Sequence, residues 1–306
     1  MKERSIVFGK QKSLVGVVTE PSQIDPSIPA VIMLNGGLVH HIGPNRLYVK
    51  LCRCLAEQGN VAFRFDFSGI GDSRVRNDNL PFEKSTIDDA QQAMDFLQST
   101  YGISQFLVMG HCSGAFNSFR VATEDERVKS IILMNPEGGN LDWDVYDRKR
   151  KEILYYSRYY SKVAVRDPAR WRKLLTGKAD YRSIMRNVFN TILLNRLRTL
   201  KFKLSNRTPK AEDPARQVLI DALHQLANRN IRIFFIYSEN STGLERIQTY
   251  LGRNLKDMVA NGIIRLDVLS HADHNYTLQS TQRDLMGLVS NWVSHLAPVV
   301  AEPQIK

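Results

Sequence analysis

The feature that most constrains the fold is the stretch at residues 106–114, which reads Phe-Leu-Val-Met-Gly-His-Cys-Ser-Gly. A short apolar run ends in Gly110, and Gly114 follows with Cys112 midway between the two glycines. Small residues two positions to either side of a polar residue let a buried strand turn sharply into a helix without a backbone clash. The pattern predicts a nucleophile elbow. Its central residue is usually serine, whereas here it is Cys112, and Ser113 lies one position later.

The length and composition of the chain limit the class of protein and the number of domains that can surround this turn. A chain of 306 residues can form one large domain or two smaller ones with a sizeable core. With 43% hydrophobic and 24% charged residues, it has the composition of a soluble globular protein. No apolar run approaches the ~20 residues of a membrane span. The first residues lead into a strand-like segment and not into the apolar core of a signal peptide, so no leader is expected.

The cysteines are few and odd in number: Cys52, Cys54 and Cys112. They provide no disulfide framework, which predicts a reducing, cytoplasmic location. Cys52 and Cys54 fall two residues apart in a predicted helix, so they point to different faces and are not expected to form a metal pair.

Positive charge is concentrated in one segment. The chain carries a formal charge of +11, and residues 148–216 hold twenty lysines and arginines against five acidic residues, a net of +15. The rest of the chain is therefore slightly acidic. This distribution predicts an anionic partner or surface that acts on the basic segment.

Apolar runs alternate with amphipathic segments on both sides of that basic segment, which predicts a mostly parallel sheet flanked by helices. The amphipathic segments carry start and stop signals such as Gly59 after the first helix. The expected strands are residues 5–9, 14–19, 30–34, 61–65, 106–109, 128–134, 231–237 and 263–269, and the expected helices are 45–58, 85–100, 114–123, 215–228, 244–260 and 278–296.

The alternation is interrupted between residues 137 and 214, where helical periodicity, aromatic residues and basic residues occur without a strand-like run. The segment is too apolar to be a disordered tail. The predicted organisation is a core domain of residues 1–136 and 215–306 with a basic helical cap, residues 137–214, over the carboxyl edge of the sheet, where ligands bind in open α/β sheets.

The predicted nucleophile is Cys112, because it lies at the exposed turn and at the N-terminus of a helix, whose field favours a thiolate. The predicted base is His274, in the loop after the last strand. His271 lies close to the strand end and is expected to be structural. The order nucleophile, acid, histidine predicts that an orienting carboxylate follows residues 231–237.

Glu239 is the carboxylate in that place, about two residues earlier than expected. Glu137, Asp142 or no acid at all are the alternatives, since a thiol is acidic enough to form an ion pair with histidine unaided. The expected oxyanion donors are the backbone N–H groups of Ser113 and Gly37.

The remaining polar residues near the predicted site are expected to be structural and not catalytic. Asp66 and Asp72 are expected to brace the loop beneath it, and His40 and His41 to lie at a solvated rim, with no metal site. The chain lacks the glycine patterns of phosphate- and dinucleotide-binding loops, so no cofactor is expected. No nucleic-acid-binding motif is recognised either.

Several of these stretches resemble the α/β-hydrolase superfamily over nearly the whole chain. Residues 35–37 with 43–46, residues 63–73, the elbow at residues 110–115 and the basic stretch at residues 171–175 look like the branch described as serine-aminopeptidase-like or exosortase-system-associated hydrolases. The resemblance implies an α/β-hydrolase fold with a cap. At the place where such proteins usually carry the aspartate of the triad, this sequence has Ser241.

A cysteine at the elbow is similar to dienelactone-hydrolase-like enzymes and to acyl transferases that carry thioester-bound groups. The predicted function is therefore acyl transfer through a covalent acyl-Cys112 intermediate, as a thioesterase or acyltransferase, on an ester or thioester substrate that an acidic carrier protein could present to the basic cap. The alternatives are hydrolysis of a small ester or lactone, and a catalytically degenerate fold that binds without turnover.

Overall fold

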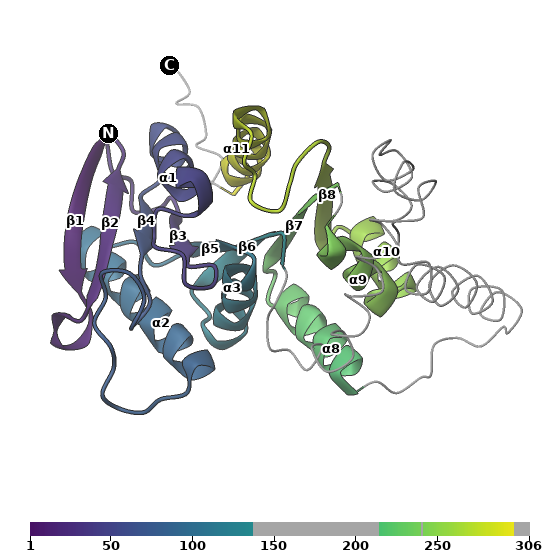
Figure 1. The fold of residues 1–306 in the computed structure, drawn as a ribbon, viewed down its shortest axis with the longest axis horizontal. Coiled ribbons are helices and arrows are strands. Elements are labelled where there is room, and N and C mark those ends of the chain that lie inside the picture. Colours follow the sequence, from purple (N-terminus) through teal and green to yellow (C-terminus); the bar gives the residue numbers. More distant parts are fainter. Residues whose placement is uncertain (137–213, 240, 297–306) are drawn as a thin grey trace, which may run out of the picture. The chain divides into compact units, whose positions relative to one another are not determined.

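The computed structural model describes residues 1–136, 214–239 and 241–296. Their centre is one eight-stranded sheet with the strand order β1-β2-β4-β3-β5-β6-β7-β8 (Figure 1). The first three strands in this order pair antiparallel, and all later neighbours pair parallel. The strands are β1 (Lys2–Phe8), β2 (Leu14–Glu20), β3 (Ala30–Leu34), β4 (Ala62–Phe65), β5 (Phe106–His111), β6 (Val128–Met134), β7 (Arg232–Ser238) and β8 (Ile264–Leu269).

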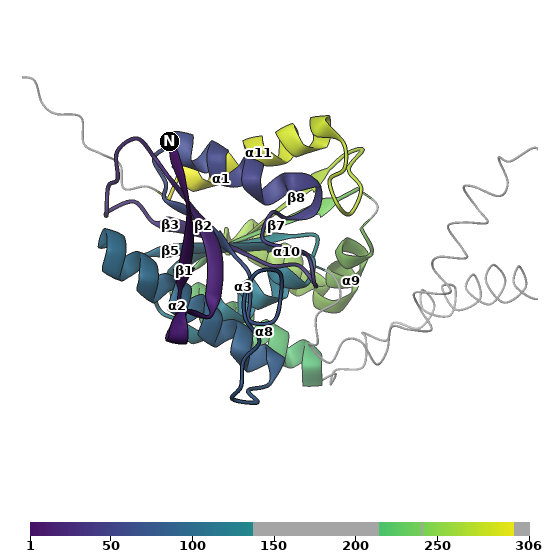
Figure 2. The same ribbon diagram turned by 60° about the vertical axis from the view of Figure 1, so that its left-hand side comes forward.

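Helices cover both faces of this sheet. Helices α1 and α11 lie side by side on one face, and α2, α3 and α8 lie on the other (Figures 1 and 2). The described helices are α1 (Leu47–Glu57), α2 (Phe82–Tyr101), α3 (Ser113–Glu124), α8 (Pro214–Asn228), α9 (Thr242–Leu251), α10 (Arg253–Ala260) and α11 (Gln279–Ser294), with short 3-10 turns at Lys10–Lys12 and Pro44–Arg46. The predicted fold class, a mostly parallel sheet between helices, is confirmed.

The central strands are apolar on both faces because helices cover both. All five residues of β3 are fully buried, and β5 is buried along its whole length. Continuous apolar strands of this kind are typical of parallel sheets covered on two sides. The parallel pairing of β3 with β5 and of β5 with β6 places the carboxyl ends of these strands next to one another, and the candidate site is built there.

Two predicted helices differ from the structure. The predicted single helix at residues 244–260 is two helices, α9 and α10, separated at Gly252, whose φ of +55° interrupts the helical path. The helix predicted to start at Ser85 starts at Phe82 instead, directly after Pro81. Proline fixes its own φ and is well tolerated at a helix start, so it outweighs the capping signal of Ser85.

The chain divides into two units, Met1–Gly139 with Val218–Lys306, and Asn140–Gln217. All eight strands belong to the first unit. The cap predicted at residues 137–214 lies outside the described residues except for Pro214, the first residue of α8, and stays a prediction. Among the described residues, none of the helices combines the length and apolar character that crossing a membrane would need.

Candidate active site

Cys112 occupies a sharp turn between β5 and α3. Its backbone angles, φ 57° and ψ −121°, lie where side-chain-bearing residues are rarely found. Its N–H donates to Met134 O (2.9 Å) at the end of the neighbouring strand β6, and its carbonyl accepts from Ala115 N (3.2 Å) in the first turn of α3. These bonds hold the strained turn from both sides, as expected for a nucleophile elbow.

Steric crowding requires glycine at both positions of the elbow, Gly110 and Gly114. A Cβ on Gly110 would lie 2.3 Å from the main-chain carbon of Gly114, and a Cβ on Gly114 would lie 2.5 Å from Leu34 O. Both contacts are with backbone, which cannot move aside as a flexible side chain can. The glycine spacing that predicted the turn therefore has its cause in the close approach of β5, α3 and the end of β3.

The turn after β3 lies directly against the elbow. A Cβ on Gly36 would meet His111 O at 2.6 Å, so this turn too depends on glycine for its approach. Gly37, with a φ of +57°, donates its N–H to Ser113 Oγ at 2.6 Å. The structure thus brings together the two residues predicted to supply the oxyanion donors. In this state the Gly37 N–H is engaged by the Ser113 hydroxyl, a contact that the sequence did not predict.

The loop that carries His274 is anchored beside the elbow. The carbonyl of His274 accepts from His111 Nε2 (2.6 Å) and from Asn135 Nδ2 (2.9 Å). The rings of His111 and His274 lie 4.7 Å apart between centroids. His111 immediately precedes Cys112. The hydrogen bond from the His111 ring therefore joins the main chain of the predicted base, His274, to the residue beside the predicted nucleophile.

Asn135 is a site residue that the sequence analysis missed. It is fully buried just after β6, and its Oδ1 accepts from Ser238 N (2.7 Å) while its Nδ2 holds His274 O. It therefore joins the carboxyl ends of β6 and β7 to the histidine loop. Its position directly after a buried strand, at the sheet edge where ligands bind, was the available signal.

Tyr48 is a second residue that the sequence analysis missed. Its hydroxyl, on α1, donates to Leu34 O (2.9 Å) and accepts from His111 N (2.8 Å), linking the ends of β3 and β5. Complete burial raises the pKa of Tyr48 above its ordinary value, and the hydroxyl remains neutral. The amphipathic pattern that predicted the helix at residues 45–58 gave no sign of this role.

The predicted acid lies in the same part of the sheet edge. The Glu239 carboxylate accepts from the backbone N–H of His271 (3.0 Å), and Glu239 N donates to Leu269 O (3.0 Å). It holds the start of the loop that leads to His274, and its role as orienting acid stays a prediction. Glu137 and Asp142 lie outside the described residues.

Ser241, at the place where the resemblance predicted an aspartate, caps helix α9. Its Oγ accepts from Gly243 N at 3.1 Å, a local cap that serine commonly provides. His271 lies at the start of the loop with a φ of +58° and an exposed side chain.

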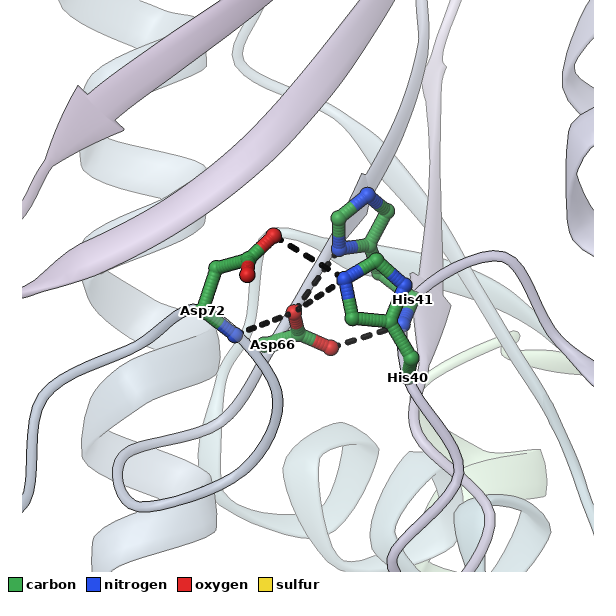
Figure 3. A group of neighbouring side chains, drawn as sticks. All are labelled: His40, His41, Asp66 and Asp72. Atoms are coloured by element: carbon green, nitrogen blue, oxygen red, sulfur yellow. Dashed lines mark hydrogen bonds and ion pairs between the residues drawn. The ribbon is translucent and has the colours of Figure 1, made fainter.

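Asp66 braces the loop beneath the site, as predicted. One of its oxygens accepts from Asn35 Nδ2 (2.9 Å) and His41 N (2.7 Å), and the other from Asp72 N (3.1 Å) and the His41 ring (2.8 Å) (Figure 3). Burial works against the charged form, but these hydrogen bonds outweigh it and lower the pKa of Asp66. The turn after β3 is thereby fixed to the end of β4. His41, predicted at a solvated rim, is buried in this arrangement, which corrects that prediction.

A mostly parallel sheet between helices, a strained turn at Cys112 after β5 and a loop with His274 after β8 are typical of α/β-hydrolase folds. The sequence model described as the alpha/beta hydrolase fold matches residues 29–226, more than half of the chain. The chain therefore belongs to the α/β-hydrolase fold family.

Similar proteins include esterases. Esterase EstD of Thermotoga maritima is 26% identical over 133 residues, which are 42% of this chain and 32% of the esterase, so the match spans about a third of that protein. An esterase of Pyrococcus furiosus superposes with a TM-score of 0.58 at 15% identity, covering 97% of this chain and 94% of that one. An alpha-beta serine hydrolase homologue from Coxiella burnetii gives 0.53 at 14% identity, covering 95% and 97%. The two structures show likeness of fold alone. The narrower branch that the sequence resembles stays a prediction.

Proposed function

We propose that the protein is an acyl-transfer enzyme that works through a covalent acyl-Cys112 intermediate on an ester or thioester. The observation that carries this proposal is the backbone of Cys112, with φ 57° and ψ −121° between β5 and α3. A strained conformation of this kind has a cost, and it is retained where the geometry serves a purpose. Here it presents a thiol at a helix N-terminus beside the predicted oxyanion turn.

In the proposed first step, the Cys112 thiolate attacks the carbonyl carbon. The N–H groups of Ser113 and Gly37 hydrogen-bond to the resulting oxyanion. The carbon–oxygen or carbon–sulfur bond to the leaving group then breaks, and the alcohol or thiol leaves with a proton from the His274 imidazolium. This step produces a thioester on Cys112.

In the second step, the neutral His274 ring removes a proton from water or from an acceptor thiol or amine, which attacks the thioester carbonyl and releases Cys112. A thioester transfers its acyl group to another thiol with little change in free energy, because the same kind of bond is broken and formed. Cysteine therefore suits a transferase, and Glu239 is the proposed orienter of the base.

The acyl donor is proposed to be anionic. The net charge of +15 on residues 148–216 suits an acidic carrier protein or a phosphorylated carrier arm. Simple hydrolysis of a small ester is the second candidate, and the partial similarity to Esterase EstD favours it. The two candidates differ in the acyl donor and in the acceptor of the second step.

The test is to mix the full chain with p-nitrophenyl acetate and follow the protein by intact mass. The expected result is a transient adduct of one acetyl group, located on Cys112 by peptide mapping, together with a burst of p-nitrophenol. Cys112→Ala removes both the adduct and turnover. Cys54→Ala is the matched control, because Cys54 is partly exposed on α1 and contacts Ser290 (3.2 Å), away from the elbow.

Turnover by Cys112→Ala at the rate of the unaltered protein would refute the proposal. If Cys112 is acetylated but deacylates in neither water nor added N-acetylcysteamine, the fold serves binding and not transfer. Faster deacylation by N-acetylcysteamine than by water distinguishes a transferase from a hydrolase.

A further inference from the structure

Four potential metal-binding side chains come together next to the oxyanion turn (Figure 3). They are His40 and His41, from the loop after β3, and Asp66 and Asp72, from the loop after β4. One donor atom of each lies within 4.8 Å of the donor atoms of the other three. The proposed acyl-transfer chemistry uses none of them, and adjacent histidines in a loop form no recognisable metal pattern in the sequence.

The spacing of the donor atoms suits a single small cation. His40 Nε2 lies 3.0 Å from Asp72 Oδ2 and 3.4 Å from Asp66 Oδ2, and His41 Nδ1 lies 2.8 Å from the same Asp66 oxygen. Zinc bound tetrahedrally at about 2.0–2.2 Å from nitrogen and oxygen ligands places neighbouring donors about 3.3–3.6 Å apart. The three observed distances lie within about half an ångström of that spacing, and all four donor atoms lie within 4.8 Å of one another, so small side-chain movements would form a four-ligand shell.

The charge of the cluster also favours a cation. In the part of the chain that the structure describes, the ion pairs of Asp66 and Asp72 are formed with the two histidines, and no lysine or arginine pairs with either carboxylate. The side chain of Asp66 is fully buried, and its two oxygens accept hydrogen bonds from Asn35 Nδ2 and from Asp72 N. Two carboxylate groups provide the charge that one divalent ion balances.

The surroundings of the cluster provide support and access. The second oxygen of Asp66 is held by Asn35 Nδ2 and His41 N, contacts of the kind that orient a ligating carboxylate. Asp72 is 61% exposed and His40 is 35% exposed, so an ion can enter from solvent without opening the core.

We propose that His40 Nε2, His41 Nδ1 and one oxygen each of Asp66 and Asp72 bind one zinc-class divalent cation, which fixes the turn carrying Gly37. On metal binding each ring adopts the tautomer whose proton is on the other nitrogen, so that the binding nitrogen has a free lone pair. Imidazole and carboxylate ligands suit zinc, cobalt and nickel better than calcium or magnesium when two of the four donors are nitrogen. The function of the ion in this proposal is structural: it joins the turn after β3 to the turn after β4. The cluster's existence does not depend on the reaction at Cys112.

The test is a titration of the full chain with Zn²⁺ against a chromophoric chelator, after treatment with EDTA, and with Co²⁺ followed by its visible absorption. The same titration of Cys112→Ala excludes binding at the catalytic thiol. The expected result is one equivalent of Zn²⁺ in both proteins, visible bands of four-coordinate Co²⁺, and a melting temperature that rises with Zn²⁺.

Two exposed ligands provide the variants, because their removal leaves the core intact. His40→Ala and Asp72→Asn are each expected to weaken Zn²⁺ binding at least tenfold and to remove the rise in melting temperature. His271→Ala, which removes an exposed histidine from the loop after β8, is the matched control and retains both. Absence of stoichiometric Zn²⁺ binding in the unaltered protein, or unchanged binding in His40→Ala, would show that the cluster is a hydrogen-bonded brace without a metal.

Discussion

Cys112 adopts a conformation that costs about 1–3 kcal/mol for a residue with a side chain. The surrounding backbone maintains it, since Met134 O and Ala115 N hold the two sides of the peptide and no side chain fits at Gly110 or Gly114. The glycine pattern predicted this turn correctly, because the steric requirement for a residue without a side chain falls on Gly110 and Gly114 themselves. The hydroxyl of Ser113 was not predictable, because its contact depends on a side-chain rotamer.

That hydroxyl leads to the first prediction. The Gly37 N–H is bonded to Ser113 Oγ at 2.6 Å, and in the proposed reaction the same N–H must bind the carbonyl oxygen of the substrate. Ser113→Ala removes the competing acceptor and leaves the backbone N–H of residue 113 in place. A hydrogen bond is worth about 0.5–1.5 kcal/mol net, so kcat/KM for p-nitrophenyl acetate is expected to rise about two- to tenfold.

Steady-state kinetics on the purified variant provide the measurement. Ser118→Ala is the control, because Ser118 lies on the same helix and its hydroxyl bonds Gly114 O (2.9 Å) away from the turn after β3. It is expected to leave kcat/KM unchanged. A tenfold fall in kcat for Ser113→Ala would contradict the prediction and would mean that the hydroxyl itself donates to the oxyanion.

Between elements, buried polar side chains join the strand ends that form the site. The second prediction concerns Tyr48, which links Leu34 O at the end of β3 to His111 N at the end of β5. Tyr48→Phe leaves both backbone groups without that partner in a buried place, so the free energy of unfolding is expected to fall by about 1–3 kcal/mol. Because the lost bonds support the elbow, kcat/KM is expected to fall as well.

Urea unfolding and p-nitrophenyl acetate hydrolysis check the two effects. The matched control is Tyr101→Phe, whose hydroxyl bonds Glu20 (2.6 Å) and Arg4 (2.8 Å). The Tyr101 hydroxyl is partly exposed, so Tyr101→Phe is expected to lower the free energy of unfolding less than Tyr48→Phe does and to leave kcat/KM unchanged. Equal effects of the two substitutions on kcat/KM would rule out a specific role of Tyr48 at the elbow.

The third prediction concerns the loop between α3 and β6. Burial raises the pKa of Asp125, but hydrogen bonds from the Arg127 side chain and backbone outweigh burial and lower it. A lowered folded-state pKa contributes stability above the unfolded-state pKa of about 3.9, and that contribution is lost as the pH falls through the folded-state value. Asp125→Asn is therefore expected to cost about 1–3 kcal/mol at pH 7, with the difference narrowing below about pH 4.

Urea unfolding of both proteins between about pH 2 and pH 7 provides the measurement. Asp95→Asn is the control, because Asp95 pairs with the same Arg127 but its side chain is 65% exposed. Its loss is expected to be below about 1 kcal/mol. If the difference in unfolding free energy between the unaltered protein and Asp125→Asn stays constant down to the lowest pH, the prediction is contradicted.

The elements themselves were largely predictable, and the reasons for the exceptions are local. Apolar runs located β3 and β6 to the residue. β3 is apolar throughout because both of its faces are covered, whereas β6 also contains the exposed Lys129 and the buried Ser130, whose hydroxyl donates to Arg232 O. The break at Gly252 was missed because a single glycine within a helical pattern is often tolerated. His41 was placed at the surface because nothing in the sequence shows that the loops after β3 and β4 meet around Asp66.

At the scale of the whole molecule, the division of charge along the chain is the main feature that the described residues leave unexplained. Residues 148–216 carry a net charge of +15, while the remainder of the chain is slightly acidic. A local excess of one sign raises the affinity for oppositely charged ligands, and salt screens this attraction over about 10 Å at 0.1 M ionic strength. The proposed acyl donors, carrier proteins and phosphorylated carrier arms, are anionic.

The fourth prediction follows from this division. The KM for acetyl-coenzyme A, an anionic thioester, is expected to rise several-fold when NaCl increases from about 50 to 500 mM, because screening weakens its attraction to the basic segment. The KM for the neutral p-nitrophenyl acetate is expected to change less than about twofold, because its binding involves no net charge. Both KM values are measured on the same protein preparation. An effect of salt on the fold itself would therefore change the KM of both substrates.

Replacing four consecutive basic residues, Arg148, Lys149, Arg150 and Lys151, by glutamine is expected to raise the KM for acetyl-coenzyme A at low salt and to reduce its salt dependence. The control removes an equal charge elsewhere, from exposed lysines of the sheet domain: Lys2, Lys12, Lys84 and Lys129. Because both variants lose the same net charge, a difference between them reports the location of the charge. If both shift the KM equally, the donor responds to the net charge of the protein and not to the basic segment.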